Sequence, residues 1–224
     1  MNVPKILENK HTPEQISALW TGYHSSLSKG TGRGYISAVI PIDTYNSLTK
    51  RARSYPSFLL PLRRSVNSKQ VENASENDEA FEFYFMQWAF HPSAPVPSSD
   101  LFTPPAKSTN PDISTILFTP LQEYKLRQTF ATPHLILTNY TDFVSSHGVV
   151  LMRGELTPSS QRAGEYLLSQ QDAQLLAFGL QRFYLPGGDA KVSEGTFKLL
   201  ESFHETPAEF EWEKLLQYAD PTRS

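Results

Sequence analysis

The histidines are the residues of this sequence best suited to metal binding or acid–base catalysis. They stand at positions 11, 24, 91, 134, 147 and 204. No two of them show the i, i+4 spacing with which a helix places two imidazoles on one zinc ion. His134, Asp142 and His147 come nearest to a constellation, because they could meet around one strand end. A small-ligand-binding or enzymatic domain with a site near these three residues is therefore our alternative hypothesis.

Other signatures of catalysis are missing from the sequence. There are no cysteines, which excludes disulfides, thiolate zinc sites, iron–sulfur clusters and cysteine nucleophiles. No Gly-x-Ser-x-Gly nucleophile motif occurs, and the glycine-rich stretch 30–34 lacks the Lys-Ser/Thr of a phosphate-binding loop. Glu155 follows Arg153 at a strand end without a paired acid, so we interpret it as a salt-bridging residue. We expect neither an enzyme nor a bound cofactor or metal.

The charge balance excludes two classes of partner. The 20 Lys and Arg residues face 23 Asp and Glu residues, for a net charge of -3. Such a chain has no basic field that would attract nucleic acid or anionic lipid. Its apolar runs are shorter than about ten residues, where a membrane-spanning helix needs about 20. We expect no nucleic-acid partner and no membrane insertion, and residues 1–11 are predicted to be a flexible N-terminus.

Aromatic residues are unusually frequent and are concentrated in one segment. The chain holds 3 Trp, 10 Tyr and 14 Phe, whereas charged residues make up only 19%. The segment Phe81–Phe90, read as a strand, is apolar on both faces. Such a strand is either covered on both sides or presents one face to a partner.

The elements that must position these residues follow from periodicity and capping signals. Thr12 and Gln15 form a capping box before the first helix. Further helices are expected to begin at Asp43, Thr119, Ser169, Ser193 and Thr206, and strands are expected over 35–40, 58–60, 81–90, 113–118, 134–140 and 149–152. This mixed order predicts a single α+β domain over 12–224, with a mostly antiparallel β-sheet of about six strands and helices packed on it.

Two segments are predicted to be mobile loops, 65–80 and 91–112. The first is rich in Asn, Ser and Glu, and the second contains six prolines. Neither composition offsets its ordering entropy by burial. The second segment could alternatively serve as a polyproline ligand for a partner's aromatic groove.

Helical periodicity separates core aromatics from candidate contact residues. Trp20, Tyr23, Leu199 and Trp212 lie on apolar stripes, so we assign them to the core. Candidates for protein binding are two off-stripe aromatics and one face of the 81–90 strand: Phe210, Phe178, Tyr84, Met86 and Trp88. Burial in a core covered on both sides is the competing interpretation for all five.

An ordered set of short motifs resembles one family, the mitochondrial ATP synthase assembly factor 1 type. The resemblance runs from Trp20 to Tyr218. Its residues are Trp20 with Tyr23, Val39-Ile40-Pro41, Pro56-Ser57-Phe58-Leu59 with Pro61 and Arg63, Phe83 to Trp88, Phe118-Thr119 with Leu121, His134 to Leu137 with Tyr140, Gly148 to Met152, Phe203, and Pro207 with Phe210.

The resemblance implies a molecular chaperone without enzyme activity, located in the mitochondrial matrix. Its partner would be the unassembled beta subunit of the ATP synthase catalytic sector, held through an apolar surface until the alpha subunit replaces it. We expect such a chaperone to be monomeric when free. Because no import segment is recognisable, we expect the chain to be a mature form with its transit peptide removed.

Overall fold

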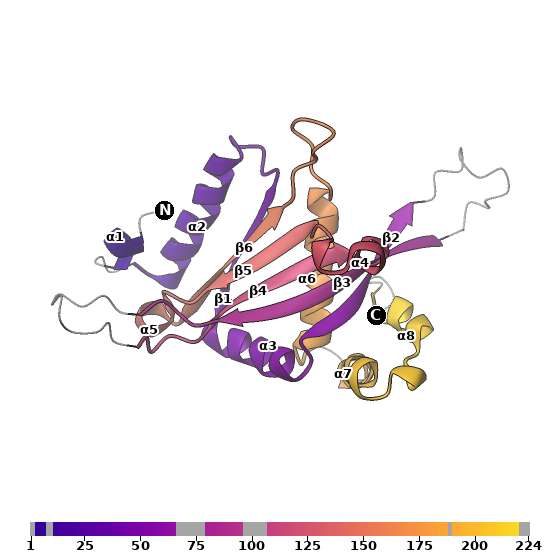
Figure 1. Ribbon diagram of the computed structural model, residues 1–224. Coiled ribbons are helices and arrows are strands. Elements are labelled where there is room, and N and C mark those ends of the chain that lie inside the picture. Colours follow the sequence, from indigo (N-terminus) through magenta and orange to yellow (C-terminus); the bar gives the residue numbers. More distant parts are fainter. Residues whose placement is uncertain (1–2, 8–10, 66–78, 96–106, 188–189, 220–224) are drawn as a thin grey trace.

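The sheet of the computed structural model has six strands in the order β1-β6-β5-β4-β3-β2 (Figure 1). The structure describes residues 3–7, 11–65, 79–95, 107–187 and 190–219. Every neighbouring pair of strands is antiparallel, which confirms the predicted α+β fold. The strands are β1 (Tyr35–Pro41), β2 (Ser57–Ser65), β3 (Glu79–His91), β4 (Ile113–Pro120), β5 (Leu135–Tyr140) and β6 (Val149–Leu156).

The helices are distributed unequally over the two faces of this sheet. Helices α3, α6, α7 and α8 contribute to the larger core, and α2 covers the opposite face over β1 (Figure 1). The helical elements are α1 (Val3–Leu7), α2 (Pro13–Leu27), α3 (Ile42–Ser54), α4 (Leu121–Arg127), η1 (Gln128–Phe130), α5 (Val144–His147), α6 (Gln170–Tyr184), α7 (Ala190–Glu205), η2 (Pro207–Glu209) and α8 (Trp212–Ala219).

The sheet curls around helix α6, because the first turn of that helix reaches both edge strands. Gln170 Nε2 donates a hydrogen bond to the carbonyl oxygen of Tyr35 in β1. Two residues later, Asp172 forms an ion pair with Arg64 of β2 at 2.5 Å. In a flat sheet of six strands the two edges would lie about 24 Å apart, too far for one helical turn to bridge. The curl therefore brings β1 and β2 to opposite flanks of α6.

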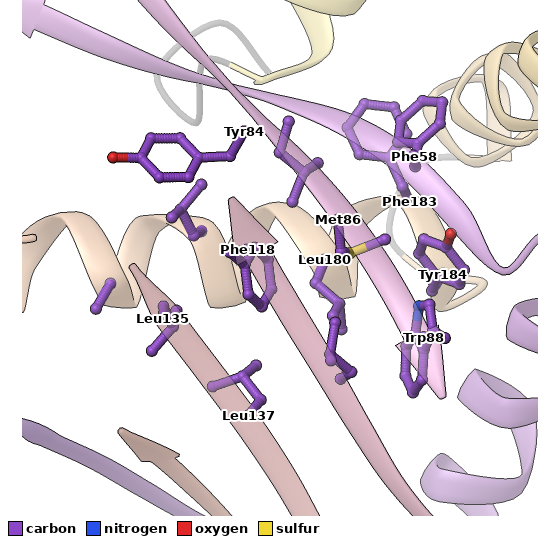
Figure 2. Close-up of a cluster of buried hydrophobic side chains, with 14 of the residues drawn as sticks. Phe58, Tyr84, Met86, Trp88, Phe118, Leu135, Leu137, Leu180, Phe183 and Tyr184 are labelled. Atoms are coloured by element: carbon purple, nitrogen blue, oxygen red, sulfur yellow. The ribbon is translucent and has the colours of Figure 1, made fainter. Parts of the chain in front are cut away.

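The larger core fills the space between the concave face of the sheet and α6. Alternate residues of each strand point into it, among them Tyr84, Met86 and Trp88 of β3 (Figure 2). From α6, Leu180 and Phe183 meet them. Every second side chain of each strand thus packs against one face of the helix, where side chains recur with a period of 3.6 residues. Burial of these large side chains is the main force that holds the curl.

A smaller core joins α2 to the other face of the sheet. Ile16 and Trp20 of α2 pack against Phe143, Val149 and Leu151. The indole Nε1 of Trp20 donates to the carbonyl oxygen of Met152 at 2.8 Å. Ile6 of α1 is buried in the same cluster, so residues 3–7 of the segment expected to be flexible form a packed helix.

Local signals placed most helix starts within a few residues. The Thr12 capping box is confirmed, with both of its hydrogen bonds present. Helix α7, however, begins at Ala190, which places Ser193 inside the helix rather than at its cap. The last expected helix is two elements, because the chain leaves helical geometry at Phe210 before α8 starts. Trp212, expected in the core, is 51% exposed in the first turn of α8, whereas Leu215 one turn later is buried.

The two expected loops lie largely outside the described residues, over 66–78 and 96–106. At their ends, Ser65, Glu79, Ala80 and His91 belong to strands β2 and β3, which are longer than predicted. Within the described ranges, no helix is both long and apolar enough to cross a lipid bilayer.

Candidate functional site

Three of the five candidate contact residues are buried in the larger core. Tyr84 and Met86 are fully buried, and Trp88 is 7% exposed. The Trp88 ring contacts that of Tyr184 (Figure 2), and it stacks on that of Phe90. Their face of β3 is the one turned toward α6, so the fold offers none of the three as a docking surface. All three are core residues, which is the competing interpretation given for them above.

Phe210 is half-buried and closes the core beside the edge strand β2. Its ring lies edge-on to Phe203 at 5.4 Å and to Phe58 at 6.3 Å between centroids. Next to this aromatic group, His204 Nε2 donates to the carbonyl oxygen of Ser57 at 2.6 Å. The segment from α7 to α8 thus packs along part of the β2 edge.

Phe178 is the candidate that the fold leaves on the surface. Its side chain is 65% exposed on the outer side of α6, one turn after Leu175, which is 36% exposed. On one flank lies an apolar cavity of about 390 Å³ that reaches β2, lined by Leu60, Leu62, Phe81, Leu175, Phe183 and Val192 among others. On the other flank lies a groove of about 610 Å³ that reaches β1. We call Leu175 and Phe178 the α6 ridge.

The groove beside β1 (the β1 groove) combines apolar walls with polar side chains. Helix α2 contributes Thr21, His24 and Ser25, and α6 contributes Gln170, Gln174, Ala177, Phe178 and Gln181. Tyr35, Ile36 and Ser37 of β1 line it between the two helices. A surface of this kind suits recognition of a polypeptide, which presents both amide groups and apolar side chains.

His24 is the unusual member of the β1 groove. It is 4% exposed, and its Nδ1 lies 2.9 Å from the carbonyl oxygen of Trp20. Since a carbonyl can only accept, Nδ1 carries the proton and Nε2 is left as an acceptor. That Nε2 is buried and has no hydrogen-bond partner in the described part of the chain. Burial lowers the pKa of His24, outweighing the bond to Trp20, so the ring is neutral at physiological pH.

The alternative catalytic constellation is not assembled. His134 directly precedes β5 and Asp142 follows it, so they lie at opposite ends of one strand, about 20 Å apart. His147 ends α5, on the Asp142 side. His134 instead contacts the hydroxyl of Tyr84, 3.3 Å from its Nδ1, and lies with its Nε2 3.8 Å from Glu123. The prediction of a site near these three residues is wrong, because the six residues of β5 separate His134 from Asp142 and His147.

A polar cluster lies at the start of β5, around His134, and the sequence did not predict it. Arg64 binds Glu82 through Nε at 2.9 Å and Asp172 through Nη1 at 2.5 Å. Burial alone would lower the pKa of Arg64, but these two carboxylates outweigh it and raise the pKa. Burial also raises the pKa of Tyr84 and lowers that of His134. The cluster connects β2 to β3 and α6, and both of its carboxylates are paired with Arg64.

Among the residues that the structure describes, no three His, Cys, Asp or Glu side chains gather closely enough to hold a metal ion. Glu155 does pair with Arg153, at 2.8 Å, as the sequence predicted. Among the described residues, the α6 ridge and the two hollows beside it combine exposed apolar side chains with concave surface. Only Phe178 among the sequence candidates belongs to them, and no sequence pattern pointed to the β1 groove.

Comparison with known proteins identifies related sequences. A family model described as "ATP11 protein" matches residues 1–216. "Protein atp11, mitochondrial" of Schizosaccharomyces pombe is 29% identical over 205 residues, which are 92% of this chain and 56% of that protein. "ATP synthase mitochondrial F1 complex assembly factor 1" is 29% identical in Danio rerio (88% of this chain, 47% of that protein) and 26% identical in Homo sapiens (94% and 47%). The chain spans about half the length of the curated relatives it matches.

Proposed function

Since the chain belongs to the ATP11 protein family, we propose that it is a molecular chaperone for assembly of the mitochondrial ATP synthase catalytic sector. It binds the free beta subunit through an apolar surface and prevents its aggregation until the alpha subunit replaces it. It acts in the mitochondrial matrix, is monomeric when free, and has neither enzyme activity nor a cofactor. Support comes from the names of its relatives, which are called F1 complex assembly factors.

The physical task of such a chaperone agrees with this surface. A subunit of an obligate ring exposes a large apolar interface before assembly, and that interface invites aggregation. The chaperone must offer apolar surface of its own, yet bind weakly enough for the alpha subunit to displace it by mass action. A few exposed apolar side chains beside hollows meet both conditions better than one extensive apolar face.

The observation that carries the proposal is the exposure of Phe178 on the α6 ridge. Its ring is 65% exposed and lines both the apolar cavity and the β1 groove, so a partner that filled either hollow would remove this ring from water. The apolar cavity on its β2 side can receive a side chain of the client, while the ring contacts the surface around it. Aromatic residues next to pockets are frequent hot spots of protein–protein binding.

The test is capture and exchange with purified subunits. The alpha and beta subunits are expressed separately and each is incubated with the tagged chain. We expect beta to be retained and alpha not to be. Alpha is then added to the complex with beta, and we expect beta to be released as an alpha–beta assembly. Retention of alpha instead of beta, or of neither, would refute the proposal.

A further inference from the structure

We propose that the exposed edge of β1 is a strand-addition site, which binds an extended segment of the client polypeptide in the β1 groove. The kind of partner follows from the backbone geometry of β1. The identity of that client as an ATP synthase subunit rests on the proposed function. The inference adds a binding mode and a place on the fold to that function.

The backbone groups of the odd-numbered residues of β1 point away from β6, and two of these residues lie between Tyr35 and Pro41. Leu156 N donates to Gly34 O, and Ile42 N donates to Gly148 O, which fixes the even-numbered residues of β1 as those bonded to β6. In an antiparallel pair the intervening residues direct their N–H and C=O groups away from the partner strand. Ser37 and Val39 therefore point these groups outward, and in the described part of the chain neither group has a partner.

The other edge of the sheet is closed in ways that β1 is not. Trp88 N donates to Pro56 O, so the backbone N–H and C=O groups of the odd-numbered residues of β2 point away from β3. Among them, Pro61 has no N–H group, and the carbonyl of Ser57 accepts from His204. Proline and covering side chains are the usual protection of an edge strand against added chains. On β1 the comparable protection that the described residues provide is Gln170 at Tyr35 and Pro41 at the far end.

The walls of the β1 groove match a polypeptide backbone. Two buried acceptor atoms, His24 Nε2 and Gln170 Oε1, have no partner among the described residues, and both side chains line the groove. Both atoms are shielded from solvent, so an N–H donor of an extended chain bonds to them only once their side chains turn toward the groove. Gln174 and Gln181 add amide groups on the α6 side.

Apolar contacts extend the match beyond the backbone. Successive side chains of an added strand point to opposite sides, so one set would face α2 and the other would face Ala177 and Phe178 of α6. The occupant is therefore an extended segment with an apolar side chain at every second position on the α6 side. Main-chain bonds would give affinity, and Phe178 would select the side chain.

The experiment uses immobilised overlapping peptides of 12 residues that cover the alpha and beta subunits, probed with the full chain. The variants are Ser37→Pro, which removes an N–H that the fold does not use, and Gln174→Trp, which fills the groove from an exposed helix position. Their matched controls are Ser37→Ala, which keeps the N–H, and Gln171→Trp, which lies outside the groove. Thermal unfolding shows which variants fold.

We expect the wild-type chain and both controls to bind the same peptides, and each test variant to bind them at least about tenfold more weakly. In the complex, the amide protons of Ser37 and Val39 should exchange more slowly with solvent. Equal binding by all five proteins overturns the strand-addition site, and so does binding of no peptide by the wild type. Binding of alpha peptides alone, lost in Ser37→Pro, would support the site and refute the proposed beta client.

Discussion

Gln170 of helix α6 occupies a hydrogen-bonding position that a seventh strand would otherwise use, because its Nε2 donates to the outward carbonyl of Tyr35 at 2.5 Å. The helix thereby closes the start of the β1 edge, and through Asp172 it also holds β2 by way of Arg64. Beyond Tyr35 the edge of β1 is open. The position of α6 between two strand edges thus accounts for the α6 ridge, for the two hollows beside it and for the open edge of β1.

Phe178→Asp should weaken capture of the beta subunit by at least about tenfold while leaving the fold intact. The ring is 65% exposed, so the substitution removes apolar contact area and places a charge at the interface without disturbing the core. Affinity is measured by titration of purified beta subunit. The matched control is Phe130→Asp, which changes an even more exposed phenylalanine on η1. Equal losses in the two variants would argue against a specific role for the α6 ridge.

Met86→Ala should lower the free energy of unfolding by about 2–5 kcal/mol, because it leaves a cavity in a fully buried site. Chemical denaturation measures the change. Gln87→Ala, on the opposite face of the same strand, should change stability by only about 0.5 kcal/mol or less. If Met86→Ala folded with wild-type stability but failed to capture the client, β3 would have to be a contact surface after all.

Gly154→Ala should destabilise the sheet by about 1–3 kcal/mol through overpacking. A Cβ at this position of β6 would collide with Ile36 and would lie 2.8 Å from Leu137 Cδ2. In contrast, Gly22→Ala should stabilise the protein by about 1 kcal/mol, since that helical glycine has open space where the methyl group would go. Both changes are read from denaturant midpoints at constant slope. Opposite signs for the two variants are the expected result.

The stability of the folded state should fall between pH 7 and pH 5, and His24 should account for part of the fall. Burial lowers the pKa of His24, with Arg153 lowering it further and Glu155 raising it. The unfolded chain therefore takes up a proton near pH 6.5 while the folded chain does not. The contribution of His24 to the free energy of unfolding is complete above that pH. It is lost as the pH falls toward the lowered pKa of His24 in the folded state.

The measurement compares the free energy of unfolding at pH 7.5 and pH 5.5 for the wild type and for His24→Gln. The variant cannot titrate at this position, so its stability should depend less on pH. An identical pH dependence in the two proteins would show that His24 is protonated in the folded state as readily as in the unfolded chain.

Local rules in the sequence predict most of the elements and the general fold. The Thr12 capping box depends on neighbouring residues only, and strand periodicity depends on neighbours two apart, so both are readable in sequence. Trp212 is expected in the core but is exposed, because it stands in the first turn of α8 and only the following turn, with Leu215 and Tyr218, packs on the core. His134 was grouped with Asp142 and His147 because proximity in sequence was mistaken for proximity at one strand end.

By itself, the sequence determined that this is an aromatic-rich α+β domain with few candidate catalytic groups, and that Phe178 lies off its helix stripe. It could not determine which face of the apolar strand β3 turns inward, since both faces carry large apolar side chains. Only the tertiary structure decided that Tyr84, Met86 and Trp88 face α6. The physical reason is the curl of the sheet: contacts between residues more than a hundred positions apart, such as Tyr35 with Gln170, set which strand edges stay open.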